Sequence, residues 1–265
     1  MRIAGFAAMG SDLSGILRRE TMRNEVRIES DQTHLWLASD FHLGNVDCDE
    51  HEIRRYVGWL TQNDSARVVL LGDLTEAAIP SHLPQTMWSQ RIAPQQQLDR
   101  VKEMLAPSRE KILASVRGNH EARIWNLTSL DPSKDIADWC GCAYLGVGDY
   151  FSLRINGIRY TLALFHGYSA SANPGYELKK AIAIWGDCDV LAIAHCHQLY
   201  REDFKRYRLV KGKRVEQRIV GLRTGGFLRY PEYAKRSFYP PGDVGNPILT
   251  LSGREKKIEV RMPGL

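Results

Sequence analysis

The stretch Val190–Tyr200, VLAIAHCHQLY, joins an apolar run to two metal-capable imidazoles, His195 and His197. A short, continuous apolar run of this kind is typical of a buried strand. A single His-x-His sequence indicates little, because histidine also serves as an ordinary hydrogen-bonded polar group. Its meaning therefore depends on whether other apolar runs of the chain end in the same way.

Four further apolar runs also end in residues of the metal-ligand type. These endings are Asp40-Phe41-His42, Gly72-Asp73, Gly118-Asn119-His120-Glu121 and His166-Gly167. Five of the eight histidines in the chain lie in the five endings, whereas chance placement would scatter them. The endings taken together therefore favour a functional site over a set of unrelated polar caps.

Amphipathic helical patterns lie between several of these runs. Residues 49–63, 95–106 and 175–187 each place apolar side chains on one stripe, and Asp49 and Glu52 have the spacing of a capping box. Alternation of strands and helices predicts a layered α/β fold. Ligands bind outside the carboxyl ends of the strands in such folds, so we expect the five endings to converge.

The spacing within two endings predicts how their side chains point. Residues i and i+2 of an extended strand face the same side, so Asp40 should face the same way as His42, and His195 the same way as His197. Cys196 should then face away and pack. Mixed nitrogen and oxygen ligands suit zinc, manganese or iron better than a thiolate site would.

In their order along the chain, the motifs Asp-x-His, Gly-Asp, Gly-Asn-His-Glu, His and His-x-His resemble the calcineurin-like metallophosphoesterase family. The resemblance covers about Leu35 to Gln198, with Ala194 in place of the Gly usual before the last motif. It implies a metallophosphoesterase-type four-layer α/β/β/α sandwich, followed here by C-terminal β-hairpins. A metallo-β-lactamase-type site fits less well, because it would need H-x-H-x-D-H where Gln198 and Leu199 stand.

The resemblance also implies a dinuclear metal site. It assigns seven ligands, namely Asp40, His42, Asp73, Asn119, His166, His195 and His197. Asp40, His42 and His197 would hold one divalent ion. Asn119, His166 and His195 would hold the other, and Asp73 would bridge the two. Manganese is the preferred ion, with zinc or iron also compatible, and a metal-bridging hydroxide would attack phosphorus.

Residues outside the ligand set have expected roles as well. The resemblance makes His120 the catalytic acid–base group, oriented by Glu121 or another acid. Candidate substrate contacts are Arg117, Arg123, Asn45 and Tyr168. The two arginines flank the His120 motif, and either could clamp a phosphate bidentately, the alternative being a surface salt bridge.

The charge distribution bears on the substrate. The net charge is +5, but residues 200–265 carry 16 Lys+Arg against 7 Asp+Glu, a local excess of +9. Tyrosines are interleaved among these cations, at Tyr200, Tyr207, Tyr230, Tyr233 and Tyr239. Such a segment suits a nucleic-acid backbone and stacked bases.

We therefore expect a phosphodiesterase acting on nucleic acid or nucleotides. The alternative is a phosphomonoesterase acting on phosphoprotein or small molecules, and a non-catalytic metal-binding scaffold is more distant.

The 265 residues are interpreted as a single metallophosphoesterase domain. It comprises an N-terminal extension (1–33), a core (about 34–199) and a basic β-rich part (about 200–265) with turns at Lys211-Gly212 and Ser252-Gly253. Residues 75–107 are expected to form an inserted loop over the site.

No apolar run approaches the roughly 18 residues of a membrane span, and no paired Cys-x-x-Cys motif or signal peptide is evident. These features favour a cytoplasmic protein with reduced thiols.

Overall fold

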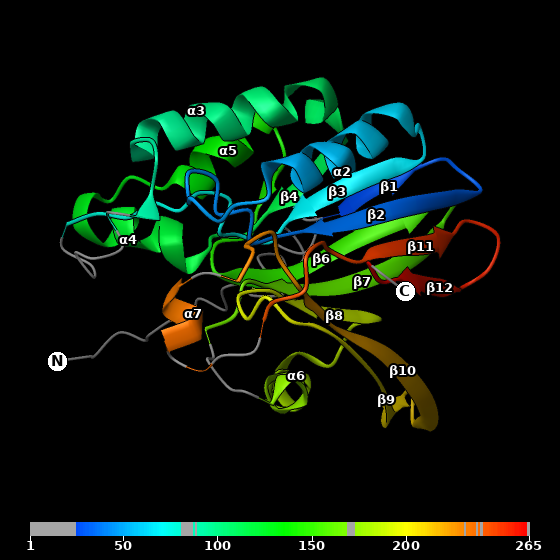
Figure 1. Cartoon of the computed structure of the whole chain (residues 1–265). Helices are drawn as coiled ribbons and strands as arrows, with labels where there is room; N and C mark the ends of the chain where they lie inside the picture. Colours follow the sequence, from blue (N-terminus) through cyan, green and yellow to red (C-terminus); the bar gives the residue numbers. More distant parts are fainter. Residues whose placement is uncertain are drawn as a thin grey trace, which may run out of the picture.

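Two β-sheets lie face to face, and helices cover the outer surface of each (Figure 1). The structure is a computed structural model that describes residues 25–80, 87, 89–168, 173–230, 232–236, 238 and 241–263. Residues 1–24 of the expected N-terminal extension and residues 81–86 and 88 of the expected insertion therefore lie outside the described residues.

The first sheet has six strands in the order β12-β11-β2-β3-β4-β5. The strands are β2 (Gln32–Ala38), β3 (Ala66–Leu70), β4 (Ile112–Ser115), β5 (Ala143–Tyr144), β11 (Ile248–Ser252) and β12 (Ile258–Arg261). β2, β3, β4 and β5 are parallel, whereas β11 pairs antiparallel with β2 and β12. The carboxyl ends of β2, β3 and β4 consequently lie at the same edge of the sheet.

The second sheet has six strands in the order β1-β6-β7-β8-β10-β9. The strands are β1 (Glu25–Ile28), β6 (Gly148–Ile155), β7 (Ile158–Phe165), β8 (Val190–Ile193), β9 (Leu199–Val210) and β10 (Lys213–Thr224). β7 and β8 are parallel, so their carboxyl ends also share an edge. β1 pairs with β6, which makes residues 25–28 of the expected extension part of this sheet.

Seven helices occur among the described residues. They are α2 (Glu50–Gln62), α3 (Pro94–Leu105), the 3-10 helix η2 (Ala106–Lys111), α4 (Asn119–Thr128), α5 (Pro132–Cys140), α6 (Pro174–Trp185) and α7 (Glu232–Arg236). α2 begins at the expected cap, where the Asp49 side chain accepts a hydrogen bond from the Glu52 amide at 3.2 Å. The capping box is only half formed, because the Asp49 amide donates to Phe227 and the Glu52 carboxylate binds Arg55. α3 occupies the second half of the expected insertion, as the apolar stripe of residues 95–106 indicated.

Three apolar cores hold the layers together. β2 shows how one strand serves two of them, because successive side chains of a strand face opposite sides. Leu35 and Leu37 face the core between the sheets, whereas Trp36 lies in the core beneath α2 and α3. The third core lies between the second sheet and α6, where Leu178 is buried. Each fully buried side chain of this kind contributes about 1.5–3 kcal/mol. The four layers confirm the expected α/β/β/α sandwich (Figure 1).

Both expected C-terminal hairpins are present. β9 and β10 pair antiparallel along their whole length, with Lys211 and Gly212 at positive φ in the turn. Only Val220–Arg223 of β10 pairs with β8, so the outer part of the hairpin projects as a two-stranded ribbon (Figure 1). At about 3.3 Å per residue, its tip lies roughly 40 Å along β9 from Leu199.

None of the helices in the described ranges has the length and apolar character to cross a lipid bilayer.

Candidate metal centre

The five sequence endings meet where the edges of the two sheets adjoin. Three of them follow β2, β3 and β4 of the first sheet, and two follow β7 and β8 of the second. The contact between sheets is direct, since Asp40 Oδ1 lies 3.3 Å from His197 Nε2. The rule for ligand sites in a single sheet therefore accounts for only part of the convergence, and the face-to-face packing accounts for the rest.

The local backbone differs from the extended conformation that we expected. β2 ends at Ala38 and β8 at Ile193. The Asp40/His42 pair and the His195/His197 pair therefore both lie in loops. Five of the seven candidate ligands have positive φ, namely Asp40 (54°), His42 (48°), Asp73 (50°), His195 (76°) and His197 (53°). The strand-alternation argument is thus wrong, and left-handed turns aim these side chains instead. Such residues cost about 1–3 kcal/mol each and cluster at functional sites.

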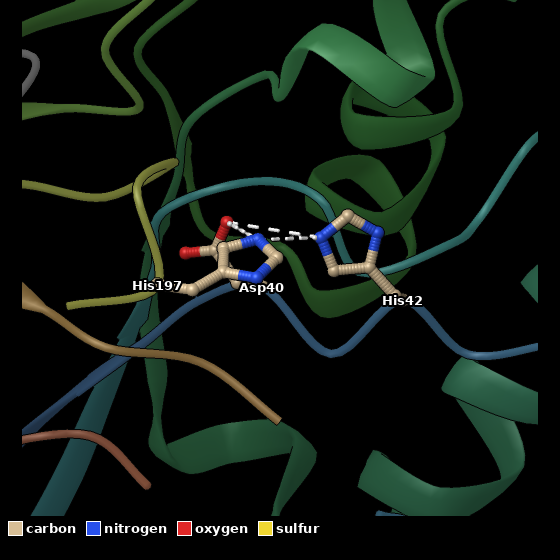
Figure 2. A group of neighbouring side chains, drawn as sticks. All are labelled: Asp40, His42 and His197. Carbon is tan, nitrogen blue, oxygen red and sulfur yellow. Dashed lines mark hydrogen bonds and ion pairs between the residues drawn. The ribbon is translucent and has the colours of Figure 1, made fainter. Parts of the chain in front are cut away.

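One group of candidate ligands consists of Asp40, His42 and His197, which point toward one another (Figure 2). His42 Nε2 lies 3.0 Å from His197 Nε2 and 3.9 Å from Asp40 Oδ1. The other ring nitrogen of His42 lies 3.2 Å from Glu76 Oε2. A carboxylate in this position fixes the imidazole orientation and leaves Nε2 directed at the group.

The second group consists of Asn119, His166 and His195. Asn119 Oδ1 lies 2.7 Å from His166 Nε2 and 2.7 Å from His195 Nδ1. His166 Nδ1 lies 2.7 Å from the Leu71 carbonyl oxygen. Because a carbonyl can only accept, Nδ1 carries a proton, and Nε2 is the nitrogen that faces Asn119 and Asp73. Asn119 reaches this group from the first residue of α4.

Asp73 lies between the two groups: it clusters with His166 and His195 on one side and with His42 and His120 on the other. Its Oδ2 is 3.2 Å from His166 Nε2 and 3.8 Å from His42 Nε2. Its Oδ1 accepts a hydrogen bond from the His120 amide at 2.8 Å. Burial raises the pKa of Asp73, but the surrounding imidazoles of His166, His120 and His42 together hold it well below the usual value. The buried carboxylate is therefore an anion at the centre of the cluster.

Glycines allow this close approach of the chain to Asp73. A Cβ on Gly118 would lie 2.1 Å from the Asp73 amide nitrogen and 2.2 Å from Asp73 Oδ1. A Cβ on Gly72, whose φ is +85°, would lie 2.5 Å from the backbone of Gly118. The glycines of the Gly-Asp and Gly-Asn-His-Glu motifs are thus required by packing around the shared carboxylate.

An unsatisfied carboxylate oxygen of Asp40 gives independent support for a divalent cation at this site. Asp40 Oδ2 accepts a hydrogen bond from the His195 amide, but the buried Asp40 Oδ1 has no hydrogen-bond partner among the described residues. A buried polar atom without a hydrogen bond costs roughly 1–3 kcal/mol of folding free energy, and a charged group such as a carboxylate costs more. A cation between Asp40, His42 and His197 would satisfy it. The mixed carboxylate, imidazole and amide donors suit manganese, zinc or iron.

His120 lies beside both groups and is held by two contacts. Its Nδ1 donates to the Glu76 carbonyl oxygen at 2.6 Å, and its Nε2 accepts from Arg123 at 2.9 Å. Its ring centroid is 4.4 Å from that of His42. Burial lowers the pKa of His120 to about 4, although Asp73 opposes the shift. The imidazole is therefore neutral in this arrangement.

Glu121 does not orient His120, contrary to one of our two expectations. Its carboxylate accepts hydrogen bonds from the Asp73 and Thr75 amides at 3.0 and 2.9 Å, and from the Thr75 hydroxyl. It therefore braces the loop that carries Asp73. Glu76 is the acid beside His120, and it was not among the residues expected from the sequence. The only available signal was an acidic residue three positions after Asp73.

The four candidate substrate contacts occupy different places. Arg123 touches His120, and Asn45 donates to the Glu76 carboxylate at 2.9 Å. The Tyr168 ring lies parallel to His195, with 6.3 Å between ring centroids. Arg117 is 3.0 Å from Asp131 and stacks on the Trp125 ring, so its guanidinium is engaged outside the ligand cluster. The structure thus brings Arg123 and Tyr168 to the candidate centre more closely than Arg117.

Two further expectations concern the last motif. Ala194 is fully buried, and its amide donates to Phe165 at 3.2 Å, so the loop accommodates its methyl group. The Cys196 side chain lies near Arg223 and belongs to none of the metal-type groups found among the described residues. Arg223 is fully buried and forms a 2.9 Å ion pair with Glu177. No feature of the sequence indicated that this arginine supports the loop.

Comparisons with known proteins found similarity only among solved structures. The sequence matches no protein-family model and no curated protein. A predicted phosphoesterase from Streptococcus pneumoniae is 13% identical, with 89% of this chain and 96% of that chain covered and a TM-score of 0.41. Vacuolar Protein Sorting 29 from Cryptosporidium parvum is 16% identical (88% and 97% covered, TM-score 0.40). The calcineurin-like phosphoesterase YfkN from Bacillus subtilis is 12% identical (87% and 90% covered, TM-score 0.40).

Proposed function

We propose that this chain is a calcineurin-like metallophosphoesterase that hydrolyses phosphoesters with two divalent cations. One observation carries the proposal: Asp73 is shared by two adjacent groups of metal-type side chains. The buried Asp40 Oδ1 supports it, because this oxygen accepts no hydrogen bond among the described residues and lies 3.3 Å from His197 Nε2, a pair that a cation would bridge.

The proposed ligand sets follow the two groups. Asp40, His42 and His197 would hold one cation, and Asn119, His166 and His195 the other, with Asp73 common to both. Manganese is our preferred assignment, and the donor set also accepts zinc or iron. Two such cations supply a water-derived nucleophile at neutral pH and neutralise phosphoryl charge.

The chain itself supplies proton transfer and positioning. Glu76 holds His120 by its carbonyl oxygen, so His120 Nε2 is the nitrogen available to exchange a proton with the leaving oxygen. A protonated Nε2 can no longer accept from Arg123. The guanidinium is then free to donate to a phosphoryl oxygen, which links the two side chains in one role.

For the substrate, we propose a phosphodiester of nucleotide or nucleic-acid type. Near the body of the protein, three cations of the basic C-terminal part pair with acids that precede β8: Arg206 and Arg208 approach Asp187, and Lys256 binds Asp189. Towards the tip of the β9–β10 ribbon, Arg214 stacks on Tyr207 instead. The Tyr233 side chain and Tyr239 lie outside the described residues.

The position of the ribbon bears on the choice of substrate. Its tip lies roughly 40 Å along the strand from the candidate centre, so only a polymer would contact both. A nucleotide-sized diester would use the centre alone. The alternative within the same chemistry is a phosphomonoesterase. We also propose that the protein acts in the cytoplasm.

The test of the proposed function is hydrolysis of bis-p-nitrophenyl phosphate by protein loaded with manganese. We expect turnover that EDTA abolishes, and a variant His120→Asn whose kcat is about 10²–10⁴-fold lower while its metal content is unchanged. Turnover of p-nitrophenyl phosphate in preference to the diester would select the monoesterase. Absence of turnover with every divalent ion would support a scaffold, and loss of metal from His120→Asn would make His120 a ligand instead.

A further inference from the structure

A cavity of about 720 Å³ adjoins the second group of candidate ligands. Asn119 and His166 belong both to that group and to the cavity wall. The remaining wall comes from α4 and the two residues before it, the loop before β6, the end of β7 and the residues after it, α6, and the end of β8. Anything bound at the second group would therefore lie beside this cavity.

Large apolar side chains are exposed around the cavity. Val147, Tyr168, Tyr176 and Ile184 line it and are 67%, 85%, 52% and 76% exposed. They come from three separate segments, so no single amphipathic element explains them. Deeper in the wall, the Phe165 and Trp185 rings contact each other with centroids 4.8 Å apart. Exposed apolar side chains gathered at one hollow mark a binding surface.

We propose, building on the proposed function, that this cavity binds an aromatic group of the phosphodiester substrate, of the nucleobase type. Four of its wall residues are aromatic: Phe165, Tyr168, Tyr176 and Trp185. Aromatic side chains bind planar bases by stacking with little dependence on base identity. Asn126 and Lys180 also line the cavity and offer hydrogen bonds to ring nitrogens and oxygens, which an aliphatic chain would leave unused.

The bound group is the one that stays on phosphorus. His120, which would protonate the leaving oxygen, is not among the described residues that line the cavity. It lies on the side of the first ligand group, with its ring against His42. The cavity instead opens beside Asn119 and His166, so the retained ester group faces it while the leaving oxygen faces His120.

The experiment compares diesters that share a p-nitrophenolate leaving group but differ in the retained group. These are bis-p-nitrophenyl, methyl p-nitrophenyl and decyl p-nitrophenyl phosphate. The variant is Ile184→Asp, and its matched control is Leu209→Asp, at a residue on β9 that is equally exposed (77%) and outside the cavity. Both positions are exposed on the surface, so neither variant should affect folding.

We expect Ile184→Asp to lower kcat/KM for the aryl diester about tenfold and for the methyl diester less than twofold, because an aspartate removes apolar contact and adds charge. Leu209→Asp should change neither. Equal losses on all diesters, or a decyl diester that is both the best substrate and the most affected, would overturn the aromatic assignment.

A binding measurement separates this proposal from the proposed function. Thymidine 5′-phosphate carries the retained group of a nucleotide diester and needs no turnover. Its affinity for manganese-loaded protein, measured by calorimetry, should fall about tenfold in Ile184→Asp, while inorganic phosphate binds both proteins alike. Unchanged affinity for thymidine 5′-phosphate would overturn the pocket, whereas absence of diester turnover alone would overturn only the hydrolase.

Discussion

Replacement of Asp73 by asparagine should remove both cations, because this carboxylate is shared. Asp73 Oδ2 lies 3.2 Å from His166 Nε2 of one group and 3.8 Å from His42 Nε2 of the other. At about 4 Å and an effective dielectric constant near 20, the attraction of a unit negative charge for one positive charge is about 4 kcal/mol. Since about 1.4 kcal/mol is a factor of ten, each cation should bind at least about 10³-fold more weakly.

The assay is metal content by mass spectrometry after dialysis against micromolar manganese, supported by titration calorimetry. Wild type should retain about two ions per chain, Asp73→Asn almost none, and His197→Ala about one, because only the first group loses a ligand. The control is Asp64→Asn, an exposed aspartate in the turn before β3. The shared-carboxylate reasoning would be refuted if Asp73→Asn retained two ions. It would also be refuted if the single substitution His197→Ala removed both ions.

Three further outcomes are expected. Gly118→Ala should weaken manganese binding at least tenfold and destabilise the fold by about 1–3 kcal/mol, because its Cβ would lie 2.1 Å from the Asp73 amide nitrogen. The control Gly58→Ala, with open space around its Cβ, should be neutral or stabilising, and equal effects would contradict the packing argument. Manganese at about 100 times its Kd should raise Tm by about 5–10 °C over EDTA-treated protein in scanning calorimetry, and an unchanged Tm would argue against a resident cation. Glu177→Gln should lower Tm by about 6–12 °C in thermal melts, because it leaves the buried charge of Arg223 unpaired; a shift under 2 °C would show that this pair is dispensable.

Elements with a strong local pattern were predictable. The five apolar runs became β2, β3, β4, β7 and β8, and the apolar stripe containing Leu98, Val101, Met104 and Leu105 faces the core. Both C-terminal hairpins were also evident from their turn residues. These features depend on neighbours in the chain, where apolar periodicity and turn chemistry act directly.

Contacts between distant segments were less accessible. Glu76 orients His42 and His120 although its sequence context is unremarkable, and Arg223 supports α6 and the last motif from inside a strand. The left-handed backbone of Asp40, His195 and His197 was not foreseen, because strand alternation assumes that the chain stays extended beyond the last apolar residue. Strand alternation led to the correct common direction for the wrong reason.

The sequence by itself determined which side chains are candidates for the metal centre, since their types and their places after apolar runs are local properties. Only the tertiary structure decided how they are divided: that Asp73 lies between two groups, that Glu76 rather than Glu121 holds His120, and that an aromatic cavity opens beside Asn119 and His166. The physical reason is that these relations span two sheets. They depend on how one packed layer meets another, and no segment of the chain carries that information alone.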